Sequence, residues 1–416
     1  MFTQGKLKIS GVLNSTFLKR TKIVLYGIII SQVIAFATSF VITSYFRPED
    51  LGILGTLSAL ISIIAGTLSF RLEIAVIQSS EADSVDVFFK STCLSILIST
   101  IFCLLCFYLP WDFARKITDH FFTFLFWCWG YFLFFNSKQL TFKFNQLKDA
   151  SLGLIWRNAF TFVFQLLSGL LNPSASLLLV GRVAGDYVGA FSHLWKYFKE
   201  FKFRKFISGW KKFILSHKDF LLYMTPHHLC IALSNNIIIF YLDNSYGLAI
   251  VGFFSLAQRL IQAPLEMIGS TMFNVTIQRY GELKHNINQL QSFYVKVVFF
   301  SFMVATFLGA TIFFSIDHII PLLGSKWLPA SDMVKSLVPY FMSTLFITPT
   351  TNLLRFIDKS RLQLIIEIVE LAIKIGFLGL PIFANSNEMV LSYGLITFLL
   401  SILKTMFVFK LIHKKN

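Results

Sequence analysis

Charged residues are scarce in this chain. Asp, Glu, Lys and Arg make up 14% of its 416 residues, hydrophobic residues make up 55%, and the mean hydropathy is +0.68. Soluble domains carry about 25% charged residues, so this composition excludes a soluble globular protein. Acidic residues are the scarcest, at 21 against 37 basic residues, which gives a formal net charge of +16. The basic residues lie between apolar runs, a pattern that orients membrane proteins against an anionic cytoplasmic surface and does not indicate a nucleic-acid partner.

Cysteines are few, and they lie inside apolar stretches. The five residues are Cys93, Cys103, Cys106, Cys128 and Cys230. Their placement provides neither a disulfide framework nor the spacing of zinc ligands, and we expect no cofactor. The first apolar run, residues 23–45, is too long for a signal-peptide core and lacks a small-residue cleavage site, so we interpret it as a retained helix.

Long apolar runs dominate the sequence instead. A helix needs about 20 residues to cross a hydrocarbon core, and backbone groups in lipid must be satisfied within the segment, so spanning runs are helices. We place such runs near residues 23–45, 51–70, 87–109, 120–136, 152–171, 174–192, 219–241, 247–268, 293–316, 335–353, 362–382 and 389–411. The sequence therefore predicts an all-α polytopic membrane protein of about 12 transmembrane helices.

Basic residues are concentrated in alternate loops of this arrangement. With the N-terminus inside, the outside loops hold only Arg47, Arg115, Lys116, Lys326 and Lys335. This asymmetry predicts an even number of spans with both termini in the cytoplasm. The outside loops are all short, the longest lying near residues 315–335.

The chain also contains an internal duplication. Residues 51–58 (LGILGTLS) align with residues 248–255 (LAIVGFFS), and the same offset carries the first span onto the seventh. This repeat predicts two pseudo-symmetric six-helix lobes, 1–192 and 219–416, around a central cavity. Chance likeness between two glycine-containing helix starts is the alternative interpretation.

A basic, aromatic stretch over 193–218 separates the two predicted lobes. Its apolar residues recur at helical spacing with lysines between them, which predicts an amphipathic linker helix on the cytoplasmic leaflet. These apolar residues are Phe203, Phe206, Ile207, Trp210, Phe213 and Ile214.

Paired charges inside the predicted spans form one set of candidates. A charge that faces lipid costs about 2.5–3.5 kcal/mol, so such residues should face a cavity or a partner. Arg182 and Asp186 share one helical face, as do Glu367, Glu370 and Lys374. Two interpretations stay open: internal ion pairs that make insertion tolerable, or a carboxylate left to bind a coupling proton or Na⁺. The coupling candidates are Glu367, Glu370, Asp186 and Glu73.

Three arginines have no acidic residue at helical spacing and form a second set. They are Arg71, Arg157 and Arg259, with Glu73 only two residues from Arg71 and therefore expected to point elsewhere. A guanidinium group in a cavity suits a phosphate or carboxylate, because its donors match such oxygens bidentately. Alternatively, Arg71 and Arg259 lie close enough to helix ends to reach interfacial water.

Three segments resemble a known family over nearly the whole length of the chain. They are residues 47–76, which begin with RPEDLG and end with FRLEIAV, residues 251–260 (VGFFSLAQRL), and residues 323–330 (LGSKWLPA). The chain resembles the Wzx-type O-antigen and exopolysaccharide flippases of the multidrug/oligosaccharidyl-lipid/polysaccharide exporter superfamily. The resemblance implies two six-helix lobes around a cavity that opens alternately to each leaflet of the bacterial inner membrane.

The resemblance also implies a substrate and partners. It implies that a polyprenyl-diphosphate-linked oligosaccharide, an O-antigen or capsule repeat unit, moves from the cytoplasmic to the periplasmic leaflet. Arg71, Arg157, Arg259 and Arg182 would then bind the diphosphate and glycan in a cationic cavity. The expected partners are this lipid-linked glycan, membrane lipids, a polysaccharide polymerase and a chain-length regulator.

Other functions stay open at this point. A polysaccharide polymerase or ligase would need a sizeable outside loop, and the outside loops here are short. A cation-coupled drug exporter would favour unpaired acids in the cavity rather than arginines. A small-solute permease is a further alternative.

Overall fold

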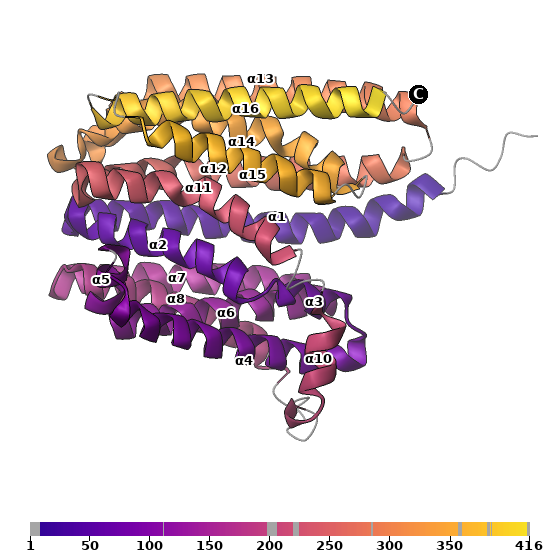
Figure 1. Ribbon diagram of the computed structural model, residues 1–416, viewed down its shortest axis with the longest axis horizontal. Helices are drawn as coiled ribbons and strands as arrows, with labels where there is room; N and C mark the ends of the chain where they lie inside the picture. Colours follow the sequence, from indigo (N-terminus) through magenta and orange to yellow (C-terminus); the bar gives the residue numbers. More distant parts are fainter. Residues whose placement is uncertain are drawn as a thin grey trace, which may run out of the picture. The chain divides into compact units, whose positions relative to one another are not determined.

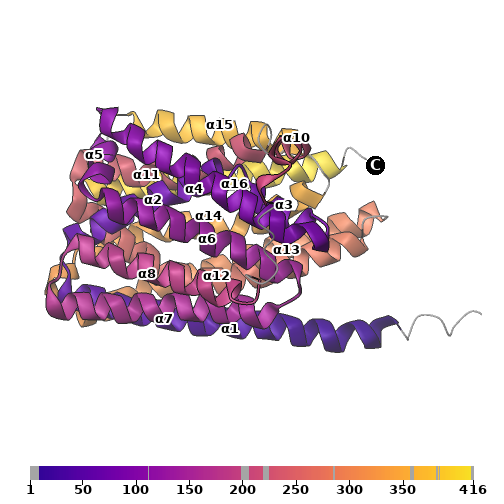
Figure 2. The same cartoon turned by 90° about the horizontal axis from the view of Figure 1, so that it is seen from below.

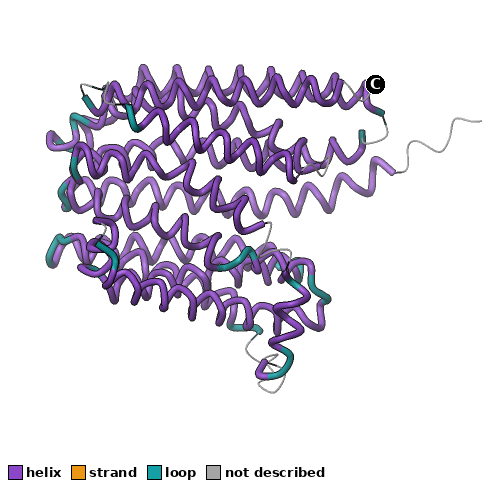
Figure 3. Tube along the Cα trace, in the orientation of Figure 1, coloured by secondary structure: helices purple, strands orange, loops and turns teal. Residues whose placement is uncertain are grey.

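Helices make up the regular structure of the residues that the structure describes. The computed structural model describes residues 9–110, 112–197, 206–218, 224–283, 286–356, 360–380, 383 and 385–413. Within these ranges every regular element is helical, as Figure 3 shows. Each predicted span coincides with one long helix: α1 (Ile9–Tyr45), α2 (Pro48–Leu68), α4 (Glu81–Leu105), α6 (Phe121–Lys143), α7 (Leu147–Leu171), α8 (Ala175–Leu194), α11 (Thr225–Tyr246), α12 (Leu248–Glu282), α13 (Ile287–Ile319), α14 (Ala330–Phe356), α15 (Ser360–Leu378) and α16 (Ser386–His413). The prediction of an all-α polytopic membrane protein is confirmed.

Several of these helices are long and apolar enough to cross a membrane, judged by length and composition only. Among the described residues, six candidate spans satisfy this criterion: Val24–Tyr45, Pro48–Leu68, Glu81–Tyr108, Leu147–Leu171, Ile287–Leu323 and Ser386–His413. The 35-residue α12 and the 33-residue α13 are each about 50 Å long at the rise of an α-helix, longer than a hydrocarbon core is thick. Their ends therefore extend past the apolar region.

Contacts divide the chain into two compact units. The first unit comprises Met1–Val41 and Ile64–Thr225, and the second comprises Ile42–Ile63 and Pro226–Asn416. In the first unit α8 packs against both α6 and α7, and in the second α14 packs against α12, α13 and α16 (Figures 1 and 2). Residues Ile42–Ile63 join the second unit although the duplication places them in the N-terminal lobe; the lobe bounds 1–192 and 219–416 stay predictions.

Within the second unit, the duplicated segments lie against each other. A Cβ added at Gly52 of α2 would overlap the carbonyl oxygen of Leu248, and one added at Gly252 of α12 would overlap that of Pro48. Gly55 similarly approaches the hydroxyl of Ser255. Small residues let helix backbones approach this closely, which is how helices associate without a hydrophobic driving force in lipid. The glycines of the repeat therefore serve helix packing.

The predicted linker helix is described only in part, since residues 198–205, including Phe203, lie outside the described ranges. Its described part contains the seven-residue helix α10 (Trp210–Ser216), which begins after Gly209 with φ +76°. Phe213 is buried in a core cluster with Leu72 and Phe88, so this face of α10 packs on protein. Ile207 and Ile214 are exposed.

Candidate functional site

Three helices of the first unit bring a buried ion pair together. Asp186 on α8 is fully buried, at 0% exposure, and one of its carboxylate oxygens accepts a hydrogen bond from Arg157 Nε on α7. Its other oxygen accepts a hydrogen bond from Trp127 Nε1 on α6 at 2.9 Å. Gly185, one residue before Asp186, permits this approach, because a Cβ there would overlap the Arg157 carbonyl oxygen. Both oxygens of Asp186 are thus occupied.

The Arg157 side chain is fixed on a second side by an aromatic ring. Its guanidinium carbon lies 4.5 Å from the ring centre of Phe134, a cation–π geometry. The hydrogen bond to Asp186 uses Nε, so the two terminal amino groups have no hydrogen-bond partner among the described residues. The side chain remains 14% exposed. Trp127, Phe134, Arg157 and Asp186, here called the arginine cluster, therefore present an oriented guanidinium edge.

The arginine cluster corrects two sequence-based expectations. Asp186 takes a counter-charge from another helix, through Arg157 on α7, and Arg157 therefore has an acidic partner. Sequence spacing reveals partners only within one helix, whereas this pair joins α7 to α8. Arg182 is half-buried on α8, one turn before Asp186 on the same helix. Three of the predicted site residues, Arg157, Arg182 and Asp186, therefore lie in one region.

A second ion pair of the first unit corrects a third expectation. Arg71 Nη1 lies 3.1 Å from Glu73 Oε1, although the two residues were expected to point apart. Phe70 and Arg71 have positive φ values of 49° and 56°, so the chain breaks between α2 and α3 (Leu72–Gln78) and helical spacing does not apply there. Ser69 Oγ also donates to Glu73 at 3.0 Å.

Glu73 is buried although it is charged in water. Its exposure is 2%, and burial raises the pKa of its carboxyl group above the usual value of 4.5, with the Arg71 charge opposing the shift.

The second unit holds a separate buried charge cluster on α15 and α16. Lys404 Nζ lies 2.6 Å from Glu367 Oε1 and 3.9 Å from Glu370 Oε2, and Lys374 Nζ lies 2.8 Å from Glu370 Oε1. The expected pairing of Glu370 with Lys374 is present. We call Glu367, Glu370, Lys374 and Lys404 the lysine cluster; it contains two acids and two bases. Each of its carboxylates contacts an ammonium group of the chain.

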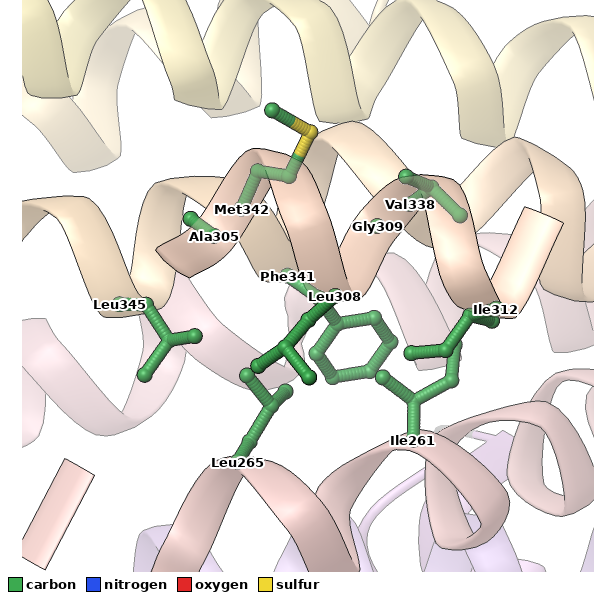
Figure 4. Close-up of a pocket in the computed structure, with 10 residues that line it drawn as sticks. All are labelled: Ile261, Leu265, Ala305, Leu308, Gly309, Ile312, Val338, Phe341, Met342 and Leu345. Carbon is green, nitrogen blue, oxygen red and sulfur yellow. The ribbon is translucent and has the colours of Figure 1, made fainter. Parts of the chain in front are cut away.

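One predicted site residue and one pocket lie elsewhere in the second unit. Arg259 is half-buried on α12. Between α12, α13 and α14 lies a small pocket that apolar side chains line, among them Leu265, Leu308 and Phe341 (Figure 4). Such a lining offers no polar group to orient a charged ligand.

Sequence reasoning missed the residues that position the charges. Trp127 and Phe134 lie in an aromatic-rich apolar run and give no signal of a polar role. Lys404 is visible as a charge within a span, but its partner Glu367 is on another helix. The partners of these residues are decided by helix packing.

The fold is similar to that of solved membrane transporters. It is similar to a structure described as the inward-facing conformation of a multidrug resistance MATE family transporter of the MOP superfamily, with a TM-score of 0.71, 14% identity and coverage of 92% of this chain and 96% of that chain. The outward-facing conformation of such a transporter matches with a TM-score of 0.65 and 15% identity over 96% and 97% of the two chains. These likenesses define a MATE-like transporter fold.

The family follows from the sequence itself. A family described as "Polysaccharide biosynthesis protein" matches residues 41–332, which is more than half of the chain. The chain belongs to this family of polysaccharide biosynthesis proteins. No curated protein sequence matches it.

Proposed function

We propose that this protein is a flippase that moves a polyprenyl-diphosphate-linked oligosaccharide from the cytoplasmic to the periplasmic leaflet of a bacterial inner membrane. Membership of the polysaccharide biosynthesis family supports a glycan substrate, and the MATE-like fold supports transport rather than enzymatic chemistry. The observation that carries the proposal is the Arg157 guanidinium group, which Asp186 and Phe134 orient while its terminal amino groups have no partner among the described residues.

The arginine cluster suits a diphosphate for physical reasons. Guanidinium donors match phosphate oxygens in pairs, and such charge-assisted hydrogen bonds are about twice as strong as neutral ones. The Arg157 guanidinium group lowers the cost of bringing an anionic head group away from water. In this proposal the sugars and diphosphate cross through a polar passage while the polyprenyl tail stays in the bilayer. Arg71, Arg182 and Arg259 remain further candidates for contacts with the head group.

Ion coupling is a second part of the proposal, with Glu73, Asp186, Glu367 and Glu370 as the candidate carboxylates. All four contact a basic group of the chain, so a coupling H⁺ or Na⁺ would compete with an arginine or a lysine.

Export of cationic drugs is the alternative function, and the description of the similar structures as multidrug resistance transporters favours it. The arginine cluster argues against it, because both oxygens of Asp186 already bind donors of the chain.

Reconstitution into vesicles tests the proposal directly. Purified protein is placed in vesicles with a labelled polyprenyl-diphosphate-linked oligosaccharide. A glycan-modifying reagent that cannot cross the membrane is added outside, and the fraction of inner-leaflet glycan that becomes accessible to it is followed with time. We expect Arg157→Met combined with Asp186→Asn to slow transfer about tenfold or more, the effect of losing charged hydrogen bonds. Arg115→Ala changes an exposed arginine of α5 (Asp112–Asp119) and is the control.

Two outcomes would contradict the proposal. Transfer equal to that of protein-free vesicles would exclude the flippase activity, and equal transfer of a lipid-linked glycan without a diphosphate would exclude the role of the guanidinium group. In cells, loss of the protein should leave the lipid-linked glycan on the cytoplasmic leaflet, whereas loss of a polymerase should leave it flipped. Organic-cation efflux from the same vesicles tests the alternative.

A further inference from the structure

The lysine cluster raises the question of what its carboxylates bind. Ion-coupled transporters need a carboxylate that can release and rebind a mobile cation. In the second unit Glu370 meets Lys374 at 2.8 Å and Lys404 at 3.9 Å, while Glu367 meets Lys404 at 2.6 Å. The two acids and two bases neutralise each other. The cluster is therefore electrically complete without an added ion.

Lys374 is the most enclosed member of the lysine cluster. Its side chain is 1% exposed, and its ammonium group donates to Glu370 Oε1 and to Ser234 Oγ of α11, both at 2.8 Å. The ring centre of Tyr393 on α16 lies 5.8 Å from the same nitrogen, within the range of cation–π attraction. Three helices thus surround this nitrogen with a carboxylate, a hydroxyl and an aromatic face.

These surroundings are built to hold a positive charge. Ser234 is 2% exposed, and the Tyr393 hydroxyl donates to its backbone carbonyl at 2.9 Å, which fixes α11 against α16. A buried charge is tolerated only when it is paired and hydrogen-bonded, and here both conditions are met. A carboxylate oxygen and a hydroxyl oxygen are also ligands that hard cations prefer.

We propose that the Lys374 ammonium group is a tethered cation that fills a site for a small monovalent cation formed by Glu370, Ser234 and Tyr393. The site lies in the second unit and is independent of which substrate the protein carries. Because the lysine is covalently attached, the wild-type site takes no Na⁺, which leaves a proton as the only coupling ion for Glu370. Removing both the charge and the volume of the lysine should convert the position into a Na⁺ site.

Two substitutions at Lys374 separate charge from space. Lys374→Ala removes the ammonium group and leaves room for an ion, whereas Lys374→Met removes the charge but fills most of the room. Purified variants are heated in detergent with NaCl, methylammonium chloride or choline chloride at equal ionic strength. For Lys374→Ala we expect a saturable rise in unfolding temperature of about 2–4 °C or more with Na⁺ or methylammonium over choline. Wild type and Lys374→Met should show no such rise.

Two further measurements test the proposal even when Lys374→Ala folds poorly. Wild-type protein should bind no more radioactive Na⁺ than Glu370→Gln, and Lys374→Ala combined with Glu370→Gln should unfold at the same temperature in all three salts. A Na⁺-dependent rise in wild type equal to that of Lys374→Ala would overturn the proposal. So would a folded Lys374→Ala variant that behaves identically in all three salts.

Discussion

Replacing Arg157 and Asp186 together should destabilise the protein less than replacing Arg157 alone. Asp186 is fully buried and receives hydrogen bonds from Arg157 Nε and Trp127 Nε1. Arg157→Met therefore leaves a carboxylate without its counter-charge in a region of low dielectric, and breaking a buried pair in this way costs about 3–5 kcal/mol. Adding Asp186→Asn removes that charge and keeps an oxygen that accepts the Trp127 N–H. Replacing both partners of a buried pair is often close to neutral.

The unfolding temperature in detergent measures this difference. One kcal/mol corresponds to about 2–4 °C for a unit of roughly 200 residues, so Arg157→Met should unfold on the order of 10 °C below wild type. The double variant should unfold within a few degrees of wild type. A double variant as unstable as the single one would refute the reasoning, because Asp186 would then not be the source of the cost. Normal glycan transfer by the stable double variant would separately exclude the Arg157 guanidinium from substrate binding.

Three further predictions concern packing and titration. Gly52→Ala should reduce the free energy of unfolding by about 1–3 kcal/mol or more and lower the yield of folded protein, because its Cβ would overlap a backbone oxygen of α12. Gly281→Ala is the control and should give normal yield, because a Cβ there meets no neighbour within 4 Å. Burial raises the pKa of Glu73, so the folded state binds more protons than the unfolded state as the pH rises above 4.5. The stability of the protein should therefore fall as the pH rises through the folded pKa. Unfolding temperatures measured across this pH range should fall for wild type, and this contribution should be absent from Glu73→Gln. Trp327→Phe should cost about 1–3 kcal/mol, measured by heating, because it removes the 2.9 Å hydrogen bond from the indole N–H to the buried Thr43 carbonyl, and an unchanged unfolding temperature would contradict this.

Sequence patterns predicted the helices closely where hydropathy alone defines them. The run at 389–411 coincides with α16 (Ser386–His413), and the run at 152–171 coincides with α7. The duplication at 51–58 and 248–255 also marked residues that contact one another in the second unit. Ion pairing was predicted only within a helix, as for Glu370 and Lys374, because residues four apart share a face.

Composition and hydropathy alone identify this chain as a helical membrane protein, since lipid offers backbone groups no partner outside their own helix. The sequence also determined which charges lie inside the spans. Their partners follow from how the helices pack: Arg157 meets Asp186 and Lys404 meets Glu367 on another helix, although the paired residues are 29 and 37 positions apart in the chain. A buried charge pairs with the counter-charge that is nearest in space, and helix packing rather than spacing along the chain sets which one is nearest, as where Gly185 lets α8 approach Arg157.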